Sequence, residues 1–107
     1  MINVDYGRSK DTFFLSMHGH AEFSADGNDI VCSAASMLIT TLAQLIKTIG
    51  DDGGTVNDPL IHLDSGVAFV TCTPKPGHKA IVNDYYKFAL TGFKLLESQY
   101  PENVKTN

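Results

Sequence analysis

The stretch from His18 to Leu45, HGHAEFSADGNDIVCSAASMLITTLAQL, decides the fold of this chain. In its second half, apolar residues recur at three- and four-residue steps with polar residues between them, and the pattern continues to Ile49. This period is typical of a helix that buries one face, so we predict a helix of about five turns. The apolar stripe consists of Val31, Ala34, Ala35, Leu38, Ile39, Leu42, Leu45, Ile46 and Ile49.

Both ends of the predicted helix carry residues that commonly cap helices. Asp29 immediately precedes the apolar run, and an aspartate there can accept hydrogen bonds from the first free backbone amides. Gly50, which begins a segment rich in glycine and aspartate, provides the stop. If Asp29 is the cap, Cys32 is the third helical residue. The helix dipole and the free amides favour an anion such as a thiolate at that position.

Cys32 and Ser36 lie one helical turn apart at the edge of the apolar stripe, so the thiol can face a groove. A cysteine beside alanines can equally be a small buried residue. His20 favours the first interpretation, because the loop that follows it can fold back toward Cys32. A histidine can take the thiol proton and later donate it to a leaving amine. The amides of Cys32 and Ser33 would then be free to bind an oxyanion.

Two boxes within this stretch closely resemble the ribosomal-processing cysteine protease (Prp) family of bacteria. They are GHA at residues 19–21 and GNDIVCSAAS at residues 27–36. The resemblance in length and element order spans nearly the whole chain. Ser33 is the visible departure inside the boxes, because alanine is common at that position in the family.

The resemblance implies that His20 and Cys32 form the catalytic pair of a cysteine endopeptidase. Gly19, Asp29 and Ser36 match other signature positions of the family motif. The known substrate of the family is the N-terminal extension of the twenty-seventh protein of the large ribosomal subunit, cut after a short aromatic-containing segment. Removal of this extension serves ribosome assembly, and no cofactor is implied.

The family resemblance also implies a small α/β homodimer with a mobile loop over the active site. Here that loop corresponds to residues 22–28. Gly27 and its small or polar neighbours favour mobility, and Phe23 is the strong apolar residue of the loop. We expect the loop to close over a bound peptide and Phe23 to turn toward the aromatic side chains of the peptide.

Length and composition limit the possible classes of protein. A chain of 107 residues is the size of one domain, here residues 1–107, and can bury a single core. A hydrophobic fraction of 43% and a charged fraction of 19% are typical of a globular protein. The net charge of −4 and the absence of basic clusters argue against a nucleic-acid-binding face. Any ribosomal partner is therefore expected to be a protein segment.

The N-terminal residues show neither a basic leader nor an apolar signal core, and no run of apolar residues approaches the length of a membrane span. We therefore expect a cytoplasmic protein without a membrane partner. In that compartment the two cysteines are expected to be reduced. Cys72 lies in an alternating run and is predicted to be a buried strand thiol.

Alternating patterns predict two hairpins that flank the first helix, from residues 2–6 with 13–17 and from residues 60–64 with 67–73. A wide apolar face from Ile81 to Tyr100 predicts a second helix that ends before Pro101. The polar tail after it, residues 102–107, is expected to fray. The predicted order β-β-α-β-β-α gives an α+β fold, a mostly antiparallel sheet with two helices packed on one face. Homodimerisation is one way to cover the other face.

Alternative interpretations of the same residues remain open at the level of sequence. His18 and His20, two apart on a strand, could bind zinc together with Cys32, although no second cysteine or C-x-x-C motif supports this. The chain could also be a non-catalytic ribosome-associated module that binds a peptide in the same groove. Asp29 could orient His20 as well as cap the helix. Ser36 could hydrogen-bond near the thiol or to its own backbone.

Overall fold

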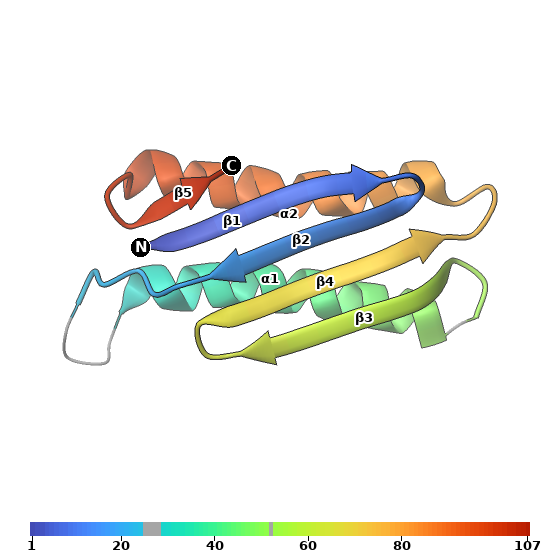
Figure 1. Ribbon diagram of the computed structural model, residues 1–107, viewed down its shortest axis with the longest axis horizontal. Helices are drawn as coiled ribbons and strands as arrows, with labels where there is room; N and C mark the ends of the chain where they lie inside the picture. Colours follow the sequence, from blue (N-terminus) through green and yellow to red (C-terminus); the bar gives the residue numbers. More distant parts are fainter. Residues whose placement is uncertain (25–28, 52) are drawn as a thin grey trace.

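The computed structural model describes residues 1–24, 29–51 and 53–107. Two hairpins, two long helices and a short last strand follow one another along the chain (Figure 1). The predicted order of elements is therefore confirmed, with one strand added at the end. The elements are β1 (Ile2–Ser9), β2 (Thr12–His18), α1 (Ile30–Asp51), β3 (Val56–Asp64), β4 (Val67–Pro74), α2 (Lys79–Gln99) and β5 (Val104–Thr106).

The five strands form one sheet in the order β3-β4-β2-β1-β5, antiparallel except at β5. β5 runs parallel to β1, with Ile2 opposite Val104, so the two ends of the chain lie side by side (Figure 1). The expected fraying of residues 102–107 is wrong. The edge of β1 offers unpaired backbone groups to this tail, and the side chain of Val104 is fully buried in the core.

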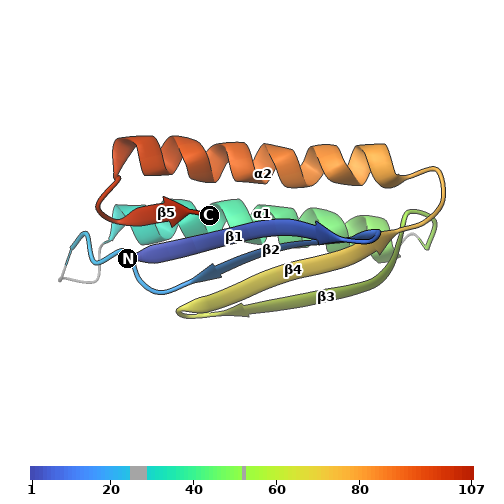
Figure 2. The same ribbon diagram turned by 45° about the horizontal axis from the view of Figure 1, so that its top comes forward.

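Both helices pack on the same face of the sheet (Figure 2). The core lies between the two layers and is built from alternate strand residues and from the predicted stripe of α1. Its members include Phe13, Leu15, Val70, Val31, Ala35, Ile39 and Ile46. The two helices approach closely where Gly92 of α2 meets Leu38 of α1, since an added Cβ at Gly92 would lie 2.5 Å from that side chain. By length and composition alone α1 would pass for a membrane span, but here its apolar stripe packs on the sheet.

Several elements are longer than the side-chain patterns predict. β1 continues through Gly7 to Ser9, and β3 begins at Val56 with a bulge between Asn57 and Leu60. α1 runs one residue past Gly50. Backbone pairing with a long neighbouring strand extends β1 and β3 through residues that carry no alternating pattern.

Candidate functional site

Asp29 caps α1 as predicted. Its Oδ1 atom accepts hydrogen bonds from the amides of Val31 and Cys32, both at 3.0 Å. Its backbone carbonyl accepts the first helical bond, from the Ser33 amide, also at 3.0 Å. The prediction that the amides of Cys32 and Ser33 are free for an oxyanion is therefore wrong, because the cap and the first helical bond already use both donors.

The second carboxylate oxygen of Asp29 holds the chain that leads into the helix. Oδ2 accepts hydrogen bonds from the amides of Phe23, at 2.9 Å, and Ser24, at 3.4 Å. The bond from the Cys32 amide, together with those from Phe23, Ser24 and Val31, lowers the pKa of this carboxyl below its ordinary value of 3.8. Within the described residues, all side-chain partners of Asp29 are backbone amides. The alternative in which Asp29 orients His20 has no hydrogen bond to support it.

The lowered pKa makes the Asp29 cap sensitive to acid. A carboxyl whose pKa falls on folding stabilises the folded state above its unfolded value, and this contribution disappears as the pH falls through the folded value. We expect Asp29→Ala to melt several degrees below the parent at neutral pH, and the difference to shrink as the pH falls below 3.8. Thermal melts over a pH series would measure this. Asp84→Ala, on an exposed position of α2, is the control and should show no such trend. A difference for Asp29→Ala that is independent of pH would contradict the interpretation.

Cys32 is half-buried in the first turn of α1, at the edge of the stripe. Its Sγ atom accepts a hydrogen bond from the amide of Ala21 at 3.3 Å, so the segment after β2 does fold back onto the helix. An amide directed at sulfur and the positive end of the helix dipole both stabilise negative charge on that atom. The sulfur thus lies at the N-terminal end of α1 with a backbone donor directed at it.

His20 is placed by two turns that meet at the end of the sheet. Gly19, with φ +95°, redirects the chain after β2, and its amide donates to the carbonyl of Gly66 in the β3–β4 turn at 2.9 Å. The imidazole lies against Gly66, since a Cβ added there would be 3.0 Å from Nε2 of His20. The ring is exposed and, within the described residues, makes no hydrogen bond to Cys32.

His20 and Cys32 line the same small pocket, of about 110 Å³, together with Gly19 and Ser36. The β3–β4 turn supplies one wall through Asp64, Ser65 and Gly66, which no sequence pattern assigned to the site. An adjoining hollow of about 320 Å³ shares Ser36, Asp64 and Ser65 and continues along α1 past Ile39 and Thr40. Because the two hollows share these residues, together they form a groove between α1 and the turn.

The remaining predicted site residues have separate positions. His18 lies at the end of β2, with Nδ1 4.0 Å from a carboxylate oxygen of Asp5. In residues 1–24, 29–51 and 53–107, no three potential metal ligands come together, so the zinc alternative has no structural support. The ring of Phe23 packs edge-on against Tyr100, with ring centroids 5.2 Å apart. Residues 25–28 of the predicted mobile loop 22–28, among them Gly27, lie outside the described residues.

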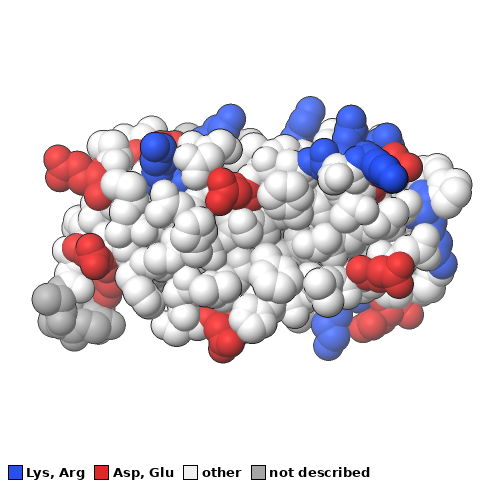
Figure 3. Space-filling view, viewed as in Figure 1, with Lys and Arg blue, Asp and Glu red and all other residues white. Residues whose placement is uncertain are grey.

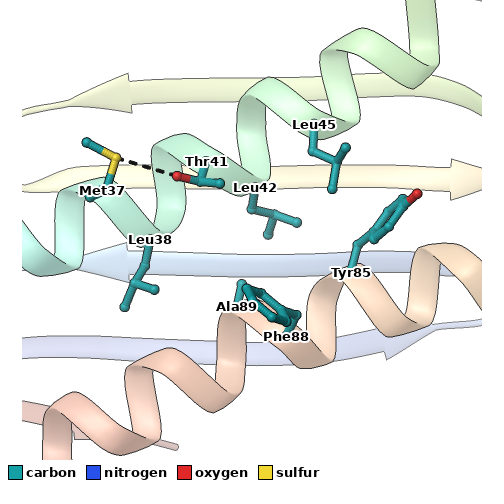
Figure 4. Close-up of a pocket in the computed structure, with 8 residues that line it drawn as sticks. All are labelled: Met37, Leu38, Thr41, Leu42, Leu45, Tyr85, Phe88 and Ala89. Carbon is teal, nitrogen blue, oxygen red and sulfur yellow. Dashed lines mark hydrogen bonds between the residues drawn. The ribbon is translucent and has the colours of Figure 1, made fainter.

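A second groove, of about 200 Å³, lies between α1 and α2 (Figure 4). Its walls are almost entirely apolar and carry no acid, base or thiol apart from the phenol of Tyr85. It therefore lacks the groups that peptide hydrolysis needs. Its lining residues are Met37, Leu38, Thr41, Leu42, Leu45, Tyr85, Phe88 and Ala89.

The fold and the pocket define a small α+β protein with a thiol at a helix N-terminus and an imidazole that lines the same pocket, an arrangement suited to nucleophilic thiol chemistry. A family model described as cysteine protease Prp matches residues 1–105. The chain therefore belongs to the cysteine protease Prp family. A search of curated proteins found no match.

Solved structures of the same fold include the ribosomal processing protease Prp of S. aureus in complex with a covalently linked product peptide. It is 25% identical, with a TM-score of 0.76, and the alignment covers 100% of this chain and 98% of that one. The same protease with a substrate peptide, at 23% identity, a TM-score of 0.71 and the same coverage, supports the fold alone. A protein of Streptococcus mutans is 25% identical, with a TM-score of 0.68 and coverage of 100% and 92%.

Proposed function

We propose that this chain is a cytoplasmic cysteine endopeptidase that removes the N-terminal extension of the twenty-seventh protein of the large ribosomal subunit. His20 and Cys32 act as the catalytic pair, and no cofactor takes part. The observation that carries the proposal is that the two side chains line one pocket while the Ala21 amide donates a hydrogen bond to the Cys32 sulfur at the N-terminus of α1. Membership of a family of cysteine proteases agrees with it.

The proposed reaction proceeds in two steps. His20 takes the proton of the Cys32 thiol as Sγ attacks the scissile carbonyl; the C–N bond then breaks, His20 passes this proton to the leaving amine, and a thioester forms. His20 then removes a proton from water, which attacks the thioester and regenerates the thiol. The complex of the S. aureus protease with a covalently linked product peptide agrees with a covalent intermediate of this kind.

The groove between α1 and the β3–β4 turn is the proposed peptide site. It opens from the thiol at Cys32 and continues past Ser36 toward Thr40. Because the Cys32 and Ser33 amides are engaged, the oxyanion would be stabilised by the positive end of the α1 helix dipole. Phe23 is proposed to contact the aromatic residues of the substrate.

The test is cleavage of the natural precursor. The purified protein is mixed with the ribosomal protein precursor from the same genome, and the products are identified by mass spectrometry. We expect one cut after the aromatic segment, and a precursor with these aromatics replaced by alanine should lose turnover as well as affinity. An intact precursor that nevertheless binds would contradict the endopeptidase and favour the non-catalytic peptide-binding module.

We also propose that two copies pair through the open face of the sheet. This face is mostly uncharged, with charged side chains gathered toward its rim (Figure 3). It carries Leu60 and Val67, which are 61% and 48% exposed. Sedimentation velocity should give a dimer that Val67→Lys dissociates. Phe88→Lys, a change on α2 at a residue 80% exposed, should leave it intact. Dissociation by Phe88→Lys and not by Val67→Lys would show that the interface lies on the helices instead.

A further inference from the structure

The C-terminal segment contacts the residue that donates to the sulfur of Cys32. The side-chain amide of Asn103 donates a hydrogen bond to the carbonyl of Ala21 at 2.9 Å. The backbone amide of Ala21 donates in turn to Cys32 Sγ at 3.3 Å. Ala21 is almost fully buried and is thus held from both sides, by residues that come from distant parts of the chain. The three residues form a short hydrogen-bonded series that ends on the thiol.

Asn103 is itself fixed in place by backbone bonds. Its carbonyl accepts a hydrogen bond from the amide of Ile2 at 2.8 Å, and its amide donates to the carbonyl of Tyr100 at 2.9 Å. These bonds attach it to the start of β1 and to the end of α2, two elements of the rigid core. Tyr100 also packs on Phe23, two residues beyond Ala21. Asn103 therefore offers a stationary donor to a segment that has no secondary structure of its own.

We infer that Asn103 is a positioning residue for Cys32. By holding the Ala21 carbonyl, its side chain keeps the Ala21 amide directed at Sγ, where that amide stabilises the thiolate. Asn103 is not among the residues that line the pocket, so it acts through Ala21 rather than on the substrate. This inference rests on the proposed role of Cys32 as nucleophile.

The test measures the reactivity of the thiol directly. In Asn103→Ala we expect the rate of Cys32 alkylation by iodoacetamide at neutral pH to fall about tenfold, as for partial loss of a hydrogen bond to a charged group. In the cleavage assay kcat should fall with little change in KM. Hydrogen exchange of the Ala21 amide should accelerate. The Gly19 amide, which donates to Gly66, should exchange as in the parent.

A matched control separates positioning from stability of the last strand. The side chain of Asn107 donates to Asp5 Oδ1 at 3.1 Å, also between the C-terminal segment and β1, and does not contact Ala21. Asn107→Ala should therefore leave the alkylation rate unchanged. Asn103→Asp keeps the size of the side chain but cannot donate to a carbonyl when ionised, so it should lower the rate as Asn103→Ala does. It also provides the measurement if Asn103→Ala fails to fold.

The possible failures are distinguishable. A parent-like rate in both Asn103 variants, or an equal loss in Asn103→Ala and Asn107→Ala, would overturn the positioning role while leaving the proposed function intact. If Cys32 of the parent protein alkylates no faster than a free cysteine in an unfolded peptide and the precursor stays uncut, the proposed function itself is wrong.

Discussion

Cys32→Ala is expected to abolish cleavage of the ribosomal protein precursor, with a loss of roughly a thousandfold or more in kcat/KM. The variant lacks the nucleophile, so no thioester can form, whatever the remaining groups contribute. His20→Ala should give a loss of similar size, because the proton of the thiol and that of the leaving amine then have no carrier. Product formation followed by mass spectrometry over long incubation measures both losses.

Both variants should remain folded. Cys32 is half-buried and His20 exposed, so neither truncation opens a large cavity, and thermal melts should stay close to that of the parent. Cys72→Ala provides the opposite control. That thiol is fully buried and accepts a hydrogen bond from Tyr86, so its removal should lower the melting temperature but leave cleavage intact. Turnover by purified Cys32→Ala would end the cysteine protease hypothesis.

Gly19→Ala is expected to have the second largest effect, on stability and cleavage together. At φ +95° a side chain is strained, and the added Cβ would lie 2.2 Å from the backbone carbonyl oxygen of Met1. The backbone must move, so we expect the free energy of unfolding to fall by roughly 3 kcal/mol. Because Gly19 directs His20 toward Gly66, the shift should also displace the imidazole from the pocket and lower kcat.

Gly77→Ala separates backbone strain from the clash. Gly77 has a similar φ of +88°, but a Cβ there would meet no atom within 4 Å. This variant should lose only the stability that the strained φ costs, roughly 1 kcal/mol, and should cleave normally. Chemical denaturation of the three proteins measures the difference. Equal destabilisation by Gly19→Ala and Gly77→Ala would show that the contact with Met1 does not affect stability.

Local patterns in the sequence were sufficient to predict the side of the site that α1 provides. The apolar period places Cys32 at the edge of α1, and Asp29 caps the helix because a cap depends only on residues within the first turn. The two hairpins follow from alternation and short turns in the same way. The position of His20 near the thiol was also predictable, since only a short loop separates β2 from α1.

The remaining features depend on tertiary pairing that no local pattern encodes. The β3–β4 turn was predicted, but it meets His20 only because β2 pairs with β4, with His18 opposite Val67. β5 has three residues and a polar flank, so nothing in its composition distinguishes it from a frayed tail. Its partner, β1, lies at the opposite end of the chain. The oxyanion prediction failed because it used the same amides twice. The Cys32 amide donates to the Asp29 cap and the Ser33 amide makes the first helical hydrogen bond, so neither is free.

The pairing of β5 with β1 has a consequence for the order in which this protein matures during its own synthesis. Ile2 and its partner Val104 are separated by almost the whole of the described sequence. Contacts of such large sequence separation carry the greatest loop-closure entropy and cannot form before both strands are available. Until residues 100–106 have been made and have docked, Ala21 lacks its Asn103 partner and Phe23 lacks Tyr100. The thiol of a chain whose β5 has not yet paired with β1 therefore still lacks its support, and the support is acquired only with this pairing.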